Sequence, residues 1–182
     1  SVYEDGEWSK SRKLSREINS KFWESHAAIS PDGNRLYFAS NRRDGEGEMD
    51  LYMSILDADG EWGPAINLGE KINSELNEDT PFPTADGKRL YYSSQGLSDN
   101  IGGYDIYYAE IYEDGTFGKP VHLGYPINTP DDDLFYQAVD AMSGYVSFFS
   151  IEEGEGREDI YRINVLEEKE MLADEAETDV VA

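Results

Sequence analysis

Hydrophobic and polar residues alternate in short runs along most of this chain, and the runs end at turns that contain glycine. Residues 36–40, Leu-Tyr-Phe-Ala-Ser, form one such run, and the turn Ser-Pro-Asp-Gly at residues 30–33 precedes it. Alternation with a period of two is typical of β-strands, and Pro, Asp and Gly are residues that tight turns favour. The pattern predicts short antiparallel strands joined by hairpins.

The runs recur with a fixed period. Gly-Glu-Trp at residues 6–8 returns at residues 60–62 and, as Gly-Thr-Phe, at residues 115–117, with spacings of 54 and 55. Two further markers keep these spacings: Ile-Asn-Ser/Thr at 18–20, 72–74 and 127–129, and Asp-Leu/Ile-Tyr at 50–52, 105–107 and 159–161. A repeat of this length is a supersecondary unit that stacks on its neighbours.

Each unit is predicted to contain four strands. The predicted first strands are 27–30, 81–84 and 135–140, the second 36–40, 90–94 and 146–150, the third 50–56, 105–111 and 159–165, and the fourth 61–69 and 116–124. Repeated four-stranded antiparallel sheets are the blades of a β-propeller. The predicted fold class is therefore all-β, a β-propeller made of four-stranded antiparallel blades, with about three blades in this chain.

Residues 1–165 are predicted to form the propeller repeats, and residues 166–182 an acidic tail or linker. Within the repeats, 1–20 supply the third and fourth strands of a preceding or closing blade, 21–73 and 74–128 one blade each, and 129–165 an incomplete blade without a fourth strand. Propellers typically have about 4 to 8 blades. Three explanations stay open: further blades in a longer chain, two chains in a six-bladed ring, or a partner protein on the open edges.

The order of these motifs resembles a known family. The Ser-Pro-Asp-Gly turn, the Leu-Tyr-Phe strand, the Asp-x-Tyr strand, and Gly-Glu-Trp followed by Ile-Asn-Ser/Thr and an acidic pair are similar to the WD40-like PD40 (TolB-type) β-propeller repeat. The resemblance is to OmpA-family, outer-membrane-associated proteins of Bacteroidota, some linked to type IX secretion and gliding. It implies a periplasmic scaffold at the outer membrane that binds protein or another envelope component.

The composition of the chain narrows the classes of function that we expect for it. The chain has 15 Lys and Arg against 39 Asp and Glu, a net charge of −24, which disfavours nucleic acid and direct membrane insertion. There is no Cys, and no phosphate-binding or serine-hydrolase motif is found. We predict a non-enzymatic binding module without a cofactor. The alternatives are an accessory propeller of a peptidase or hydrolase, and a carbohydrate-binding module that uses Tyr and Trp at loop bases.

Carboxylates recur just before the predicted first strands. Glu24, Glu78 and Asp133 hold equivalent positions, and Asp79 and Asp132 lie beside two of them. In a propeller these connections lie at one rim, so the acids are placed to surround one mouth of the central channel. Such a ring would bind Ca²⁺ or a basic peptide. The other interpretation, which we favour, is that the acids cap turns.

The aromatic residues divide into a repeated set and an isolated one. Neighbouring aromatics of the second strands must face opposite sides of a sheet, so one of each pair is predicted to lie between blades. The pairs are 37–38, 91–92 and 148–149, and Trp8, Trp62 and Phe117 are predicted to cover the outer core. Trp23 has no aromatic counterpart and is a candidate binding anchor. Together with His26 and the five acids it completes the candidate rim site: Trp23, Glu24, His26, Glu78, Asp79, Asp132 and Asp133.

Overall fold

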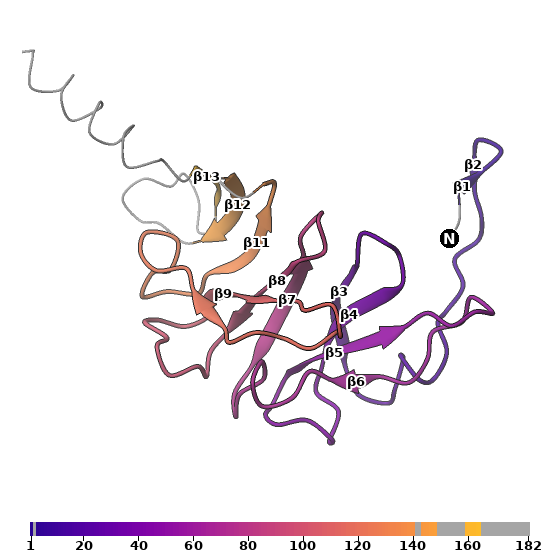
Figure 1. Cartoon of the computed structure of the whole chain (residues 1–182), viewed down its shortest axis with the longest axis horizontal. Helices are drawn as coiled ribbons and strands as arrows, with labels where there is room; N and C mark the ends of the chain where they lie inside the picture. The colour runs from indigo at the N-terminus through magenta and orange to yellow at the C-terminus, as the bar shows by residue number, and fades with distance from the viewer. Residues whose placement is uncertain (2, 141–142, 149–158, 165–182) are drawn as a thin grey trace, which may run out of the picture.

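The computed structural model describes residues 1, 3–140, 143–148 and 159–164, and within them the chain is all-β (Figure 1). The predicted tail and the segment 149–158 lie outside the described residues. The described residues form thirteen strands. β1 (Tyr3–Glu4) and β2 (Glu7–Trp8) form a separate hairpin, and the other strands form three sheets.

Each of the three sheets is antiparallel, and its strands follow one another in chain order. The first contains β3 (Glu24–Ile29), β4 (Arg35–Ser40), β5 (Asp50–Ile55) and β6 (Ile66–Asn67). The second contains β7 (Glu78–Pro83), β8 (Arg89–Ser94), β9 (Asp105–Glu110) and β10 (Val121–His122). The third contains β11 (Leu134–Ala138), β12 (Ser143–Phe148) and β13 (Asp159–Asn164). The predicted four-stranded antiparallel unit is confirmed for the first two sheets, and none of the three closes on itself.

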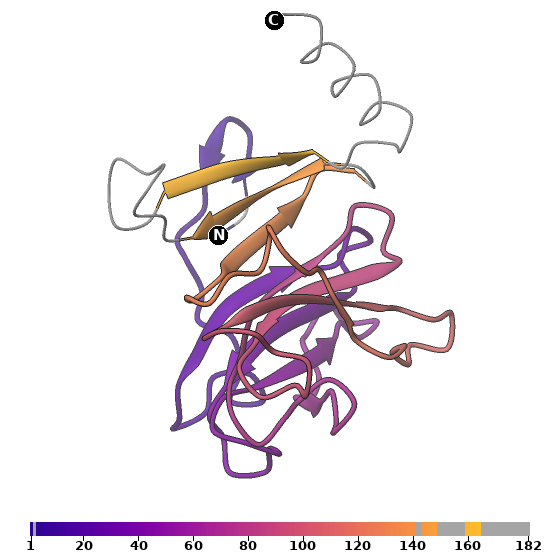
Figure 2. The same ribbon diagram turned by 90° about the vertical axis from the view of Figure 1, so that its left-hand side faces the viewer.

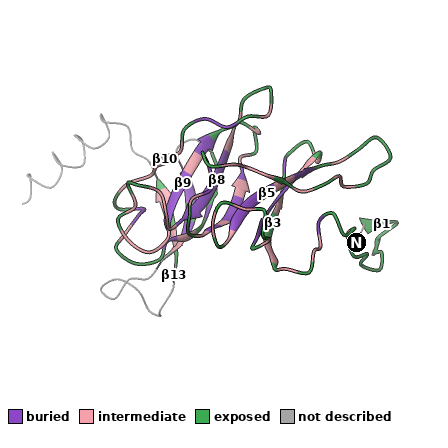
Figure 3. Cartoon of the chain, turned by 90° about the horizontal axis from the view of Figure 1, so that it is seen from below, coloured by how far each residue is buried: buried purple, intermediate pink, exposed green. Residues whose placement is uncertain are grey.

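The sheets lie beside one another in chain order, each with its first strand against the sheet before it (Figure 1). β7 contacts β3, β4 and β5, and β11 contacts β7, β8 and β9. Buried residues form one apolar cluster between the first and second sheets and another between the second and third (Figure 3). The predicted opposite facing of neighbouring aromatics is confirmed, because Tyr92 belongs to the first cluster and Tyr91 to the second.

The alignment of the third unit differs from the prediction. Phe148 pairs with Asp159, in the place where Ser94 pairs with Asp105 in the second sheet. Residues 144–148 are therefore the counterpart of the second strand, and the predicted alignment is wrong by two residues. Of the residues predicted there, Phe149 and Ser150 lie outside the described residues.

A glycine explains the shift. Gly144 takes the position that Leu90 holds in β8, and a Cβ on Gly144 would lie 2.7 Å from the ring of Tyr136. The Tyr136 ring belongs to the core between the second and third sheets and lies against this glycine. An alignment by apolar residues passes over Gly144 and begins the strand at Val146, which is buried one position beyond Tyr145.

The N-terminal segment is partly packed. Leu14 and Ile18 lie against Leu36 and Phe38 on the free face of the first sheet. The β1–β2 hairpin is exposed, and the prediction that Trp8 covers the core is wrong because its side chain is 70% exposed beside Tyr3 (Figure 3). No described sheet lies behind that hairpin. The same prediction is confirmed for the partly buried Trp62 and the buried Phe117.

Candidate functional site

Two of the repeated acids are fully buried and held by hydroxyl and amide groups of their own connection. The Ser74 amide and hydroxyl donate to Glu78 at 2.8 and 2.6 Å, and the Ser94 hydroxyl donates to it at 2.6 Å. The Thr129 amide and hydroxyl donate to Asp133 at 2.6 and 3.2 Å. Ser74 and Thr129 each lie four residues before the acid that they bind, so each carboxylate caps the turn that leads into the first strand of its sheet.

The third acid, Glu24, forms an ion pair with Arg42. The Ser20 hydroxyl donates to Glu24 at 2.5 Å, again from four residues earlier, and Nη2 of Arg42 lies 3.3 Å from the same oxygen. The Arg42 guanidinium also lies over the rings of Phe38 and Tyr52, at 5.2 and 4.8 Å from their centroids. A cation over aromatic faces is attracted by the ring quadrupole. Arg42 thus binds the acid and covers the free face of the first sheet.

Burial without a cation changes the protonation of the other two acids. It raises the pKa of Glu78, and it raises the pKa of Asp133 to about 6. The structure places each of the three acids in a hydrogen-bond network of its own sheet. Among the described residues, no group of three His, Asp or Glu side chains is arranged to hold a metal ion.

His26 and Asp79 come together between the first strands of the first and second sheets, β3 and β7. The His26 Nδ1 atom lies 2.7 Å from Asp79 Oδ1, and the His26 ring makes an edge contact with Phe135 at 5.2 Å between centroids. His26, Thr80 and Phe135 hold equivalent positions and all have a left-handed backbone, with φ of 41, 51 and 60°. The strand pairing shifts at each of these residues. This repeated bulge brings side chains of all three first strands into contact.

Left-handed backbone costs about 1 kcal/mol or more for residues other than Gly, and most for β-branched ones such as Thr80. Two hydrogen bonds hold Thr80 there: its amide donates to Asp79 Oδ1 at 2.8 Å, and its hydroxyl bonds with Ser93 Oγ at 2.8 Å. Sequence reasoning missed these bulges because the three residues have no side-chain type in common.

Asp132 acts within its connection. Its Oδ1 atom accepts a hydrogen bond from the Tyr104 amide at 3.0 Å. Burial raises the pKa of Tyr104 to about 12, and the charges of Asp79 and Asp132 act in the same direction. Tyr104 immediately precedes β9, so Asp132 holds its backbone there, and the charges of Asp79 and Asp132 help to keep its hydroxyl protonated.

Trp23 is an exposed member of the candidate site, at 75%. Its backbone is fixed, because its amide donates to Asn41 Oδ1 at 2.9 Å and its carbonyl accepts from the Asn41 amide at 3.3 Å. Asn77, its counterpart, makes a similar backbone bond with Gln95 at 2.9 Å. Since the same connection forms with Asn, the indole is not required by the fold and remains a candidate anchor.

The repeated Ile-Asn-Ser/Thr, which marks the period in the sequence, contains an asparagine with a structural role. Asn73 accepts from the Leu51 amide at 2.8 Å and donates to the Leu51 carbonyl at 3.0 Å. Asn128 does the same with Ile106, at 2.7 and 3.0 Å. Each asparagine therefore fixes a connection to the third strand of the sheet before it. An amide at a fixed distance after a glycine turn was the available signal.

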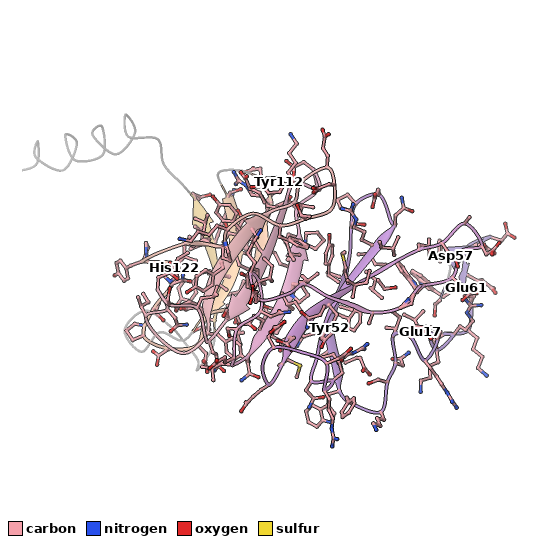
Figure 4. The ribbon with its side chains drawn as sticks, turned by 60° about the horizontal axis from the view of Figure 1, so that its bottom comes forward. Glu17, Tyr52, Asp57, Glu61, Tyr112 and His122 are labelled. Atoms are coloured by element: carbon pink, nitrogen blue, oxygen red, sulfur yellow. The ribbon has the colours of Figure 1, made fainter. Side chains whose placement is uncertain are left out.

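His122 also has a structural role. Its Nδ1 atom accepts from the Gly124 amide at 3.1 Å, so Nε2 is assigned the proton and donates to Asp105 Oδ2 at 2.9 Å. Figure 4 shows His122 toward one side of the molecule and Asp57 and Glu61 toward the other. His26 and His122 belong to separate networks, and within the described residues neither ring is hydrogen-bonded to a serine hydroxyl.

A cavity of about 810 Å³ lies at the other end of the strands, between the turns of the second and third sheets. Arg89, Tyr91, Tyr112 and Val139 line it, and the Arg89 guanidinium lies 4.7 Å from the Tyr108 ring centroid. A smaller cavity of about 240 Å³ occupies the corresponding place between the first two sheets. Aromatic rings beside charged groups can bind a polar ligand. No candidate residue was predicted at this end.

The fold and the candidate site define an all-β repeat protein built from antiparallel sheets whose repeated polar residues fix the connections between sheets. Comparison with protein-family models and with curated proteins gave no match. In the described part of the chain, no helix has the length and apolarity needed to cross a membrane.

Proposed function

We propose that the chain is a non-enzymatic binding module of the β-propeller class, in which the three sheets serve as blades of a rigid scaffold. Support comes from the way each sheet stacks on the next through equivalent residues, and from the repeated Asn and acid side chains that fix the connections. Such connections give rim residues a fixed position, which lowers the entropy cost of binding.

Trp23 is the observation that carries this proposal. An exposed indole on a backbone held by two hydrogen bonds is a preorganised anchor, and Trp is enriched among the residues that dominate interface energies. The partner is a protein or another component of the cell envelope, in the periplasm at the outer membrane. The resemblance to PD40 repeats supports that location, and the charge of −24 favours a partner with a basic surface.

Site-specific photo-crosslinking in the native cells tests the proposal. A photoreactive aromatic residue replaces Trp23 in one strain and Tyr112, which is 48% exposed at the other end of the strands, in the control strain. We expect a discrete adduct from position 23, recovered with the outer-membrane fraction, and none of that mass from position 112. Equal adducts from both positions, or none from position 23, would contradict the proposal.

The larger cavity favours carbohydrate as a second candidate ligand. The exposed Tyr112 offers a ring there, and Asp86, Lys88 and Arg89 offer hydrogen-bond partners for hydroxyl groups. A glycan array probed with the wild type and Tyr112→Ala tests this function. Signals that are unchanged in the variant would exclude the cavity as the binding site.

A further inference from the structure

The third sheet differs from the other two at its outer edge. In the first sheet Tyr52 pairs with Asn67 of β6, and in the second Tyr107 pairs with His122 of β10. In the third sheet β13 is the last strand among the described residues (Figure 2). An edge strand presents backbone groups that can pair with another strand.

The face of the third sheet that points away from the second sheet is also exposed at residues that are buried in the other sheets. Ile160 is 79% exposed, whereas its counterparts Leu51 and Ile106 are fully buried by the next sheet. Tyr145 is 44% exposed, whereas its counterpart Tyr91 is 7% exposed. The positions that form the core between sheets therefore have no described cover in the third sheet.

Residues 12–19 have the same sequence pattern as the segments that bind the third strand in the first and second sheets. The Leu68 amide donates to the Leu51 carbonyl at 3.0 Å, five residues before the Asn73 side chain binds the same residue. Leu14 and Asn19 are the equivalents of Leu68 and Asn73. The Asn19 side chain donates instead to the Leu14 carbonyl at 3.1 Å.

The turn before Asn19 already has the required shape. The Asn19 amide donates to the Ser15 carbonyl at 2.9 Å, as the Asn73 and Asn128 amides donate to the residues four before them at 2.9 Å. The side chain needs only to turn from its own loop to the backbone of a third strand. Little backbone ordering has to be added on binding.

Charge supports the pairing of this segment with β13. His122 lies 2.9 Å from Asp105 in the second sheet, and the equivalent residues are Lys13 and Asp159, which have opposite charges. Arg12 would face Arg162, an unfavourable pair, but Arg12 has a counter-ion in Glu61 at 3.1 Å.

We propose that residues 12–19 of a second copy of this chain pair with β13 as the fourth strand of the third sheet. In this pairing the Asn19 side chain binds the backbone amide and carbonyl of Ile160. A second copy is required because the N-terminal hairpin and β13 lie at opposite ends of the array (Figure 1). Reciprocal exchange closes two copies into one ring of six sheets, and this rests on the propeller arrangement proposed above.

Light scattering across a concentration range tests the exchange with three charge variants. Lys13→Glu places a like charge beside Asp159, and Asp159→Lys places one beside Lys13. Like charges at such a contact should raise the dimer dissociation constant at least about tenfold. Lys10→Glu is the matched control, because it makes the same charge change at an exposed residue outside the pairing segment.

Mixing makes the test specific. Lys13→Glu and Asp159→Lys chains each clash with themselves, but one of each forms a ring in which both contacts join opposite charges. We expect the mixture to regain the dimer mass and neither variant alone to do so. A monomeric wild type, or a dimer that Lys10→Glu weakens as much as Lys13→Glu, would overturn the proposal.

Hydrogen exchange gives a second readout. The amides of Ile160 and Arg162, which alternate with that of Tyr161 and face the proposed strand, should become protected as the wild type dimerises, and not in Lys13→Glu at the same concentration. Unchanged exchange in a proven dimer would place the contact elsewhere and overturn the strand pairing. Because these measurements use purified protein alone, their failure leaves the crosslinking result at Trp23 intact, and the reverse also holds.

Discussion

At the scale of single residues, the polar side chains of this protein act mainly on its backbone. Glu78 and Asp133 cap turns, while Asn73 and Asn128 each bind both backbone groups of a third-strand residue. The sequence located all four correctly but could not assign their environment. An acid before a strand looks the same in sequence whether it faces solvent or a Ser hydroxyl, and only the packing of neighbouring sheets decides between them.

Asp133 makes the stability depend on pH. Its folded pKa of about 6 lies above the reference value of 3.8, so the folded state binds more protons between these values and loses stability as pH rises through them. Lowering the pH from 7 to 5 should therefore stabilise the wild type by about 1 kcal/mol more than it stabilises Asp133→Asn. Urea unfolding of both proteins at each pH measures this difference. Equal gains would show that Asp133 titrates normally.

The asparagine contacts can be measured with an internal control. Asn73→Ala removes the partner of two buried backbone groups of Leu51 and should lower the free energy of unfolding by about 1 to 3 kcal/mol. Asn19→Ala removes one bond within an N-terminal turn and should cost less than about 1 kcal/mol in the monomer. Urea unfolding at low protein concentration compares them, and a larger loss for Asn19→Ala would contradict this role of Asn73.

At the scale of elements, alternation and turn residues predicted all the third strands and the second strands of the first two units well. They predicted the second strand of the third unit, and the first and fourth strands, less well. The first strands of the first two units begin at the acids Glu24 and Glu78. In the first unit this is three residues before the predicted start at Ala27, because a bulge at His26 interrupts the alternation. The fourth strands are only two residues long, and Trp62 and Phe117 pair as isolated bridges. Bulges and short edges depend on tertiary contacts, which a pattern with a period of two does not contain.

The revised alignment of β12 gives a test at the same scale. Gly144→Ala adds a methyl group 2.7 Å from the Tyr136 ring and should destabilise the protein by about 1 to 3 kcal/mol. Under the alignment predicted from sequence, Gly144 would lie in the turn and the change would be nearly neutral. Thermal unfolding with Ser147→Ala as the control, on the same strand, separates the two alignments. A neutral Gly144→Ala would restore the predicted one.

At the scale of the whole molecule, the sheets form a linear array in which each contacts its neighbours. Only the second sheet has a described sheet on both faces, since β7 contacts the first sheet and β11 contacts the second. In such arrays stability is close to a sum of unit and interface contributions, so units at the ends open more readily than those in the middle. The same property makes the ends the places where a partner or a second copy adds most stability.

Native-state hydrogen exchange of the monomer should therefore follow the order of the sheets. Amides of β8 and β9 should exchange slowest, those of β4 and β5 faster, and those of β12 and β13 fastest, because the first sheet is covered by Ile18 and Arg42 while the third leaves Tyr145 and Ile160 exposed. Exchange at low concentration, with Lys13→Glu to suppress exchange of strands between copies, isolates this gradient. Uniform protection across the three sheets would instead mean that they unfold as one cooperative unit, and the coupling between neighbouring sheets would have to be stronger than the stability of any single sheet.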